Sequence, residues 1–596
     1  HNSYSLFLKK YLHKLRFTLQ VNTTEGVVEG TVATDGQYYT FYGLHYGGNT
    51  GGENRFKDPP PPPMYPGTYH AINNNVMCAQ PTTRGLMGTE NCLTLNVFTK
   101  NATTPQPVVV WLVSDEYTNS LTERSFRSLV MEDIVVVQVN HRLSVFGFLC
   151  MGVAEAPGNA GLKDVTQALR WIKSNIAGFG GNPDNVILFG HGSGAAMVDL
   201  LTLSPLSSNL IHKAVVQSGS ALAPWAISYN PLDMARQLGA KLNITARDHS
   251  ALARSLITVS AENITTQLNT FKPLGNTVLF APCIENIHLN PNNTFLADAP
   301  INLYKSGNYN THINYITGYT SMEGSMRADE AAYDGWLEKM EANFTAFLQP
   351  DLNFVTNLTS AERSIRQFYF EQKQINQETI RDFIEYHGDT LVLVSVIRGA
   401  KARAATSTAA VRLLQFAYKG TTTEWPFQSV PIEGARHGAV MNFLLQFELR
   451  PIEDLPVSQS LINRFVNFFK TGYDSFLLLS YPQSAFSIVI FTTLRSPIRL
   501  ANMEIMAISP AVDCDDNDSK INKDCLTQYL RLRGDGPIAN TSFYLESPQV
   551  NPHTQRMNFW ENLYHRYYVP PQPVAGSALR VASFGLLLLV TQLLLL

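Results

Sequence analysis

The sequence has almost no excess of one sign of charge, and it contains few cysteines. Its 596 residues carry 45 Lys and Arg against 48 Asp and Glu, which gives a net charge of −3. A nucleic-acid-binding protein needs a basic excess or a basic stripe, so the near-neutral balance excludes nucleic acid as a partner. Six cysteines are too few for a disulfide scaffold, but they fit a few local bridges in a secreted protein.

Short apolar runs rich in β-branched residues are what the sequence does contain. Four of them are Val108–Val113, Ile134–Val139, Val186–Phe189 and Ala214–Gln217. Continuous runs of this kind are typical of strands that are buried on both faces, as in a parallel sheet. Between two of them, residues 159–176 place apolar side chains at helical spacing. This alternation predicts an α/β fold with a large, mostly parallel central sheet and helices on both faces.

A glycine-rich turn follows the apolar run that ends at Phe189. Its sequence is Gly190-His191-Gly192-Ser193-Gly194, between a predicted strand and a predicted helix. The turn has the glycine spacing of a dinucleotide-binding loop, but the acid expected about 20 residues later is absent. It also resembles a nucleophile elbow, Gly-x-Ser-x-Gly, which exposes a catalytic serine. In that alignment Gly192 occupies the nucleophile position, and Ser193 comes one residue too late.

Further motifs occur in a fixed order along most of the chain. They are Gly88–Val97, Asn140–Leu143 with Phe146–Phe148, Gly158–Asp164, Asn175–Pro183, Gln217–Ser220, Phe469–Gly472 and Phe559–Leu563. With these motifs the chain resembles the type-B carboxylesterases, the cholinesterase-like branch of the α/β-hydrolases. The resemblance implies one α/β-hydrolase domain over residues 20–566, with residues 1–19 unassigned. It also implies ester hydrolysis by a serine, a histidine and a glutamate, with no cofactor and no metal.

The resemblance carries over to the catalytic positions only in part. It places the acid at Glu323 and the base at His437, whereas Gly192 stands at the nucleophile position. Ser193 is a poor substitute, because the residue after the nucleophile starts the helix and its hydroxyl points elsewhere. The family's His-Gly-Gly-Gly oxyanion segment corresponds to residues 113–116, which read Val-Ser-Asp-Glu. We therefore expect a degenerate catalytic site in which Glu323 and His437 survive as a buried pair.

The cysteines are interpreted through the same resemblance. Cys78 and Cys92 match the family's first disulfide. The loop between them lacks the tryptophan with which cholinesterases bind choline, so choline recognition is not expected. We expect Cys514 and Cys525 to pair with each other. Cys150 and Cys283 lie in apolar contexts and are expected to be buried free thiols.

The two signals that bear on location are glycosylation motifs and the C-terminal segment. Residues 584–596 form an apolar run shorter than a membrane-spanning helix. Small residues and a spacer within residues 567–583 precede it, which predicts a stalk and a GPI-attachment signal with Gly576 or Ser577 as the attachment site. The protein is therefore expected outside the cell, anchored to the plasma membrane by a lipid. Motifs for N-glycosylation occur at Asn22, Asn101, Asn243, Asn263, Asn292, Asn343, Asn357, Asn517 and Asn540.

Three hypotheses about function are open from the sequence. The first is a catalytically inactive, carboxylesterase-like surface glycoprotein that binds an unidentified extracellular protein. Such a protein resembles the members of the adhesion branch of the family, which includes neuroligin, neurotactin and glutactin. The second is an active or divergent carboxylesterase, and the third is a binder of small lipophilic molecules. Fold alone does not choose among them, because function depends on the site.

Overall fold

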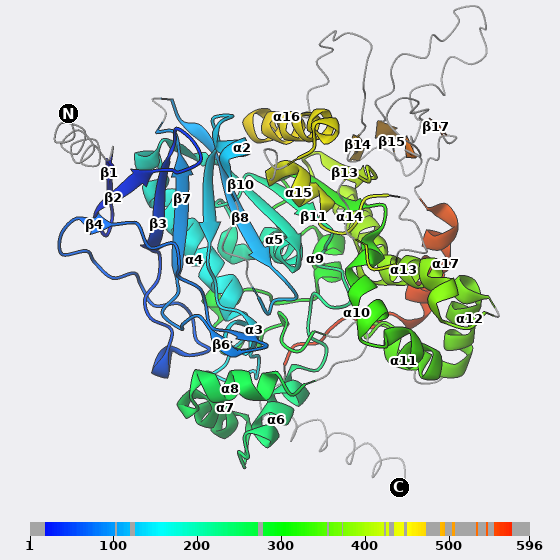
Figure 1. Cartoon of the computed structure of the whole chain (residues 1–596). Coiled ribbons are helices and arrows are strands. Elements are labelled where there is room, and N and C mark those ends of the chain that lie inside the picture. The colour runs from blue at the N-terminus through cyan, green and yellow to red at the C-terminus, as the bar shows by residue number, and fades with distance from the viewer. Residues whose placement is uncertain are drawn as a thin grey trace, which may run out of the picture.

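The computed structural model describes residues 18–101, 104–119, 125–271, 278–354, 357–371, 373–421, 425–427, 434–445, 450–472 and 553–574. It also describes four short strands between residues 489 and 545. The elements are arranged around one 13-stranded sheet (Figure 1). Its order is β1 (Thr18–Thr23), β2 (Gly26–Val32), β3 (Tyr39–His45), β7 (Thr94–Thr99), β9 (Val135–Val139), β8 (Gln106–Ser114), β10 (Gly181–Gly192), β11 (Lys213–Gln217), β12 (Asn314–Thr320), β13 (Val411–Phe416), β14 (Val489–Leu494) and β15 (Glu504–Met506), with β4 (Tyr69–His70) beside β2.

The central strands of this sheet are parallel, and its two sides are antiparallel. Neighbouring strands run parallel from β9 through β8, β10, β11 and β12 to β13. The other neighbouring pairs in this order are antiparallel, whereas β4 pairs with β2 in parallel. Two small sheets lie apart, formed by β5 (Gln80–Thr82) with β6 (Gly85–Met87) and by β16 (Leu532–Arg533) with β17 (Tyr544–Leu545). The predicted α/β fold class is confirmed, and the four apolar runs fall in β8, β9, β10 and β11.

Helices cover both faces of the sheet. They are α2 (Arg127–Val130), α3 (Ser144–Phe148), α4 (Ala160–Asn175), α5 (Ser193–Leu203), α6 (Pro231–Lys241), α7 (His249–Thr258), α8 (Ala261–Leu268), α9 (Pro300–Ser306), α10 (Ala328–Tyr333), α11 (Trp336–Ala342), α12 (Leu358–Phe370), α13 (Ile380–Gly388), α14 (Val394–Thr406), α15 (Ala439–Leu445), α16 (Leu455–Thr471) and α17 (Thr554–Tyr567).

The side chains of β8 point alternately into two hydrophobic cores, which explains why the apolar runs are continuous. Val108, Val110 and Leu112 pack in a core shared with α4 and α5. Val109 and Trp111 pack in a second core with α2, α15 and α16. Because successive side chains of a strand point to opposite faces, a strand between two helical layers needs an apolar residue at every position.

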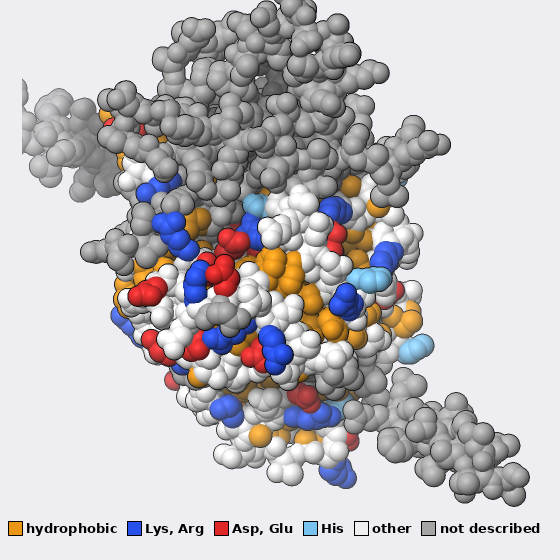
Figure 2. All heavy atoms as spheres, turned by 90° about the vertical axis from the view of Figure 1, so that its right-hand side faces the viewer, with side chains coloured by type: hydrophobic (Ala, Val, Ile, Leu, Met, Phe, Trp, Pro, Cys, Tyr) orange, Lys and Arg blue, Asp and Glu red, His pale blue; other side chains and the backbone are white. Residues whose placement is uncertain are grey.

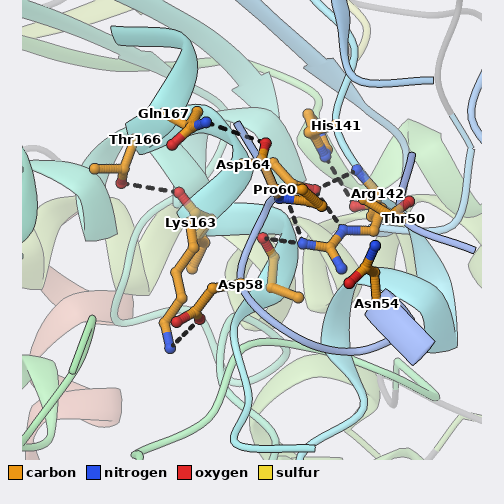
Figure 3. A network of polar contacts seen from close by, with 12 residues as sticks. Thr50, Asn54, Asp58, Pro60, His141, Arg142, Lys163, Asp164, Thr166 and Gln167 are labelled. Carbon is orange, nitrogen blue, oxygen red and sulfur yellow. Dashed lines mark hydrogen bonds and ion pairs between the residues drawn. The ribbon is translucent and has the colours of Figure 1, made fainter. Parts of the chain in front are cut away.

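An ion pair connects two of the sequence motifs beneath the sheet (Figure 3). Arg142, from the Asn140–Leu143 motif, contacts Asp164, from the Gly158–Asp164 motif, at 2.6 Å, and both side chains are buried. Lys163 pairs with Asp58 at 3.0 Å, and Gln167 donates a hydrogen bond to the carbonyl of Pro60. The proline-rich segment is thereby fixed against α4.

The last described residues run along the domain after α17. The N–H of Val569 donates to the carbonyl of Asp351, and that of Val574 donates to Ile284. Val574 is buried beside Cys150 and Cys283. Residues 568–574, which the sequence assigned to a stalk, therefore contact the α/β body. The remainder of the expected stalk and tail, including Gly576 and Ser577, lies outside the described residues.

The face made by α10 to α13 and α17 is shown in Figure 2. Acidic and basic side chains lie next to one another there, around a strip of hydrophobic side chains. Tyr333 is an exposed aromatic residue of α10 on this side of the chain. The mixture of signs agrees with the small net charge of the sequence.

Candidate active site

The turn from β10 into α5 has the geometry of a nucleophile elbow. Gly192 lies at φ 59° and ψ −125°, a region of backbone space that strongly favours glycine. The framing glycines are needed because the chain is tightly packed. A Cβ on Gly190 would lie 2.3 Å from the carbonyl oxygen of Gly194, and one on Gly194 would lie 2.4 Å from that of Leu112.

Space for a side chain is present at position 192, which a glycine occupies. Among the described residues, a Cβ built on Gly192 would meet only one neighbouring atom within 4 Å, the Nε2 of His437 at 4.0 Å. The missing side chain would thus point at the imidazole nitrogen that takes the serine proton in a Ser-His-acid triad. Gly192 therefore lies where the sequence predicted the elbow position, and a glycine has no group that can attack a carbonyl.

The acid and the base predicted from sequence are brought together. Nδ1 of His437 lies 2.5 Å from Oε2 of Glu323. Oε1 of Glu323 accepts hydrogen bonds from the hydroxyl of Ser218 at 2.7 Å and from the N–H of Thr320 at 2.6 Å. Glu323 begins the short 3-10 helix η5 (Glu323–Arg327), which is separated from the end of β12 by two residues, and its carboxylate is buried. The pair therefore has the orientation of a working dyad.

Ser193 is directed away from the dyad. Its hydroxyl donates to the carbonyl of Ser114 at 2.7 Å and accepts the N–H of Tyr117 at 3.1 Å. The residue is buried at the start of α5. Both contacts tie its hydroxyl to the segment after β8, as expected for the residue that follows the nucleophile in an elbow.

The segment after β8 differs from the family's glycine segment in its residues and in how two of its amides are bonded. Glu116 and Tyr117 take positive φ angles of 48° and 58°, which are uncommon for residues with side chains. The N–H of Asp115 donates to the carbonyl of Asn119 at 2.8 Å, and the N–H of Tyr117 is bound to Ser193. An oxyanion hole requires N–H groups that are free to converge on the developing charge. Two amides of this segment are bonded within the protein instead.

Carboxylates also stand where the family presents glycines. Desolvation raises the pKa of the Asp115 carboxyl, the charge of Glu116 raises it further, and His437 and Arg327 lower it. Glu116 pairs with Arg327 at 2.6 Å, and Arg327 also contacts Glu330 at 2.8 Å. Asp115 lies in the wall of the cavity, and no residue that the structure describes donates a hydrogen bond to its carboxylate.

These groups line a cavity of about 510 Å³. Its polar lining includes Asp115, Glu116, His191, Ser193, Arg327 and His437, and its apolar lining includes Met87, Trp225, Val278, Met326, Leu391 and Met441. The volume falls within the range of about 300–1,000 Å³ that is usual for small-molecule sites.

His191 and Arg327 were missed by the analysis of the sequence. The His191 ring lies 4.6 Å from that of His437, centroid to centroid. Its position next to Gly192 in the elbow was the available signal. Arg327 lies four residues after Glu323, at the end of η5, but its pairing with Glu116 depends on a contact between segments 211 residues apart.

The cysteines differ from expectation in one pair. Cys78 and Cys92 form the disulfide that the resemblance implied. Cys150 and Cys283 also form a disulfide, so the expectation of free thiols was wrong. These two cysteines are 133 residues apart, and their apolar surroundings hid a pairing that only folding creates. Cys514 and Cys525 lie outside the described residues.

Seven of the nine glycosylation motifs fall within the described residues, and all seven asparagines are exposed. They are Asn22, Asn101, Asn243, Asn263, Asn292, Asn343 and Asn357. Asn517 and Asn540 lie outside the described residues. None of the helices that the structure describes has the length and apolar character to cross a membrane.

Comparison with known proteins adds four findings. The model of the carboxylesterase family matches residues 18–489. Venom carboxylesterase-6 of Apis mellifera is 27% identical over 75% of this chain and 85% of its own length. Human bile salt-activated lipase is 29% identical over 70% of this chain, and the matched part covers 58% of the length of that lipase. The crystal structure of juvenile hormone esterase from Manduca sexta matches the fold with a TM-score of 0.73 at 21% identity, over 92% of this chain and 100% of that one.

Proposed function

The chain belongs to the carboxylesterase family, and we propose that it is a catalytically inactive member that acts as a cell-surface binding protein. The observation that carries this proposal is the glycine at position 192, at the tip of an otherwise well-formed elbow. Without a side chain there, the buried pair of Glu323 and His437 has no hydroxyl to activate.

The segment after β8 supports the same proposal independently. The amides of Asp115 and Tyr117 are bonded inside the protein, and a carboxylate faces the place where negative charge would develop. Removing a single oxyanion donor typically lowers turnover about 10²- to 10³-fold. Loss of the nucleophile and loss of this stabilisation are separate changes in distant parts of the sequence.

An extracellular location is part of the proposal. The disulfides Cys78–Cys92 and Cys150–Cys283 suit an oxidising compartment. The exposed asparagines of the seven described glycosylation motifs are accessible to modification. We propose attachment to the plasma membrane by a GPI anchor at Gly576 or Ser577, with an extracellular protein as partner. This places the chain functionally beside the adhesion branch of the family.

A second candidate is ester hydrolysis by a divergent mechanism. It is favoured by the names of the relatives, which are a carboxylesterase and a lipase. In this chain it would need a nucleophile other than residue 192. Ser193 is the nearest hydroxyl in the elbow, but its contacts with Ser114 and Tyr117 hold it away from His437.

Ester hydrolysis by the purified protein separates the two candidates. We expect no turnover of p-nitrophenyl acetate or butyrate above that of a Ser193→Ala control. A His437→Gln variant controls for water activated by the dyad alone. Turnover that disappears in both variants would establish a Ser193-dependent esterase and would reject the inactive assignment.

A further inference from the structure

The hydrogen-bonding character of the cavity is reversed relative to an ester-hydrolysing site. A hydrolase of this type offers N–H donors to a carbonyl oxygen, which is an acceptor. Here two of the groups that face the cavity, the Asp115 carboxylate and Nε2 of His437, are acceptors, while the lining donor Arg327 is paired with Glu116 and Glu330. The Asp115 carboxylate is open to the cavity, while the N–H groups of Asp115 and Tyr117 are used within the protein.

His437 contributes a second acceptor. Because its Nδ1 faces the Glu323 carboxylate at 2.5 Å, the neutral imidazole carries its hydrogen on Nδ1. Its Nε2 is then the acceptor, and it faces the space left by the missing side chain at Gly192. In a hydrolase the serine hydroxyl donates to this nitrogen. In this chain the position is open to a hydroxyl or an ammonium group brought by a ligand.

The rest of the cavity favours an apolar body. Met87, Val278, Met326, Leu391 and Met441 supply aliphatic and thioether surface, and Trp225 supplies a ring. Trp225 is held in place by a hydrogen bond from its Nε1 to the carbonyl of Leu391 at 2.8 Å. Methionine-rich walls adapt to ligands of different shape.

We propose that this cavity binds a lipophilic small molecule whose head group is a hydrogen-bond donor, an alcohol or a primary ammonium. The head group donates to Nε2 of His437 in the space at Gly192 and to the Asp115 carboxylate. This inference rests on the proposed absence of ester hydrolysis and names the ligand class of that same site. Esters and carboxylates bind poorly, because they present only acceptors to these two acceptors.

Four probes with the same ring test the proposal on the purified full chain. Benzyl alcohol and benzylamine are donors, whereas methyl benzoate and benzoate have acceptors only. Isothermal titration calorimetry at pH 8 should give affinities for one or both donors at least about tenfold higher than for the other two. The alcohol and amine arms tell which head group is preferred.

Two substitutions locate the binding site. Gly192→Ser fills the space with a hydroxyl that itself donates to His437, so it should weaken donor binding about tenfold. Asp115→Asn should weaken binding of benzylamine more than that of benzyl alcohol. Gly52→Ser is the matched control, because Gly52 has φ +60° and no neighbour within 4 Å of its Cβ position. Circular dichroism checks that each variant is folded.

The result separates failure of this inference from failure of the proposed function. Equal affinities for donors and acceptors, or donor binding that neither Gly192→Ser nor Asp115→Asn weakens, would reject the ligand class. Release of benzoate and methanol from methyl benzoate by the unmodified protein would reject the inactive assignment instead.

Discussion

Restoring a serine at position 192 should return little esterase activity by itself. Gly192→Ser puts a hydroxyl in the open space in front of His437, since only Nε2 of that residue lies within 4 Å of the added Cβ. A residue with a side chain at φ 59° and ψ −125° costs about 1–3 kcal/mol of strain. We therefore expect a folded protein with a lower unfolding temperature, and the triad of serine, His437 and Glu323 would be complete.

The missing oxyanion donors limit that variant. Losing one such donor typically costs about 2.7–4 kcal/mol in the transition state, or about 10²- to 10³-fold in turnover. Changing residues 113–116 to His-Gly-Gly-Gly removes the carboxylates of Asp115 and Glu116 and frees the segment to refold. Together with Gly192→Ser, this change should raise kcat for p-nitrophenyl butyrate at least about 10²-fold above the single variant.

Comparison of the single, loop-only and combined variants decides the matter. The loop-only variant, which keeps Gly192, is the matched control and should remain inactive. If Gly192→Ser alone reaches the turnover of the combined variant, the segment after β8 is a functional oxyanion hole and our interpretation of it is wrong.

Three further results are expected. Phosphatidylinositol-specific phospholipase C should release the protein from cells, whereas retention on the membrane after this treatment and after carbonate extraction would point to a membrane-spanning anchor. Asp164→Asn should lower the free energy of unfolding, measured in urea, by about 3–5 kcal/mol, because the substitution leaves the buried Arg142 charge unpaired. The control is Asp184→Asn, at an exposed ion pair with Lys173, which should change the free energy of unfolding by less than about 1 kcal/mol. Burial raises the pKa of Glu285 to about 7, although Lys163 opposes this shift. At a pH between the lower pKa of Glu285 in the unfolded chain and this raised pKa, the folded state holds a proton that the unfolded chain has released. Stability should therefore fall between pH 5 and 8 by up to about 3 kcal/mol, and a Glu285→Gln variant with the same slope would contradict this.

The sequence was informative about the site because the family motifs are local. Glu323 and His437 each lie in a short turn that is recognisable on its own, and the structure joins those turns through a bridge between Met322 and Arg436. Gly192 was identified because it stands between Gly190 and Gly194 in the elbow motif. These two glycines are part of the motif because the backbone packs too closely around them for a side chain. The apolar runs of β8 to β11 predicted a sheet buried on both faces, which is confirmed.

Contacts between residues far apart in the chain could not be predicted from local motifs. The Cys150–Cys283 disulfide was missed because nothing near either cysteine distinguishes a partner 133 residues away from a free thiol. The contact of Glu116 with Arg327 and the tilted ring contact of His191 with His437 also join separate elements. Such contacts depend on how strands and helices are placed, which local propensity does not specify.

The sequence by itself determined the α/β class and the family, and it predicted a glycine at the elbow position with Glu323 and His437 as acid and base, since each depends on residue identity or on local periodicity. Only the tertiary structure decided which way the remaining polar groups point. It turned the Ser193 hydroxyl toward Ser114 and Tyr117, bonded the Asp115 amide to Asn119, and left the Asp115 carboxylate facing the cavity with His437. The reason is physical: a hydrogen bond depends on distances and angles between groups that the folded backbone brings together.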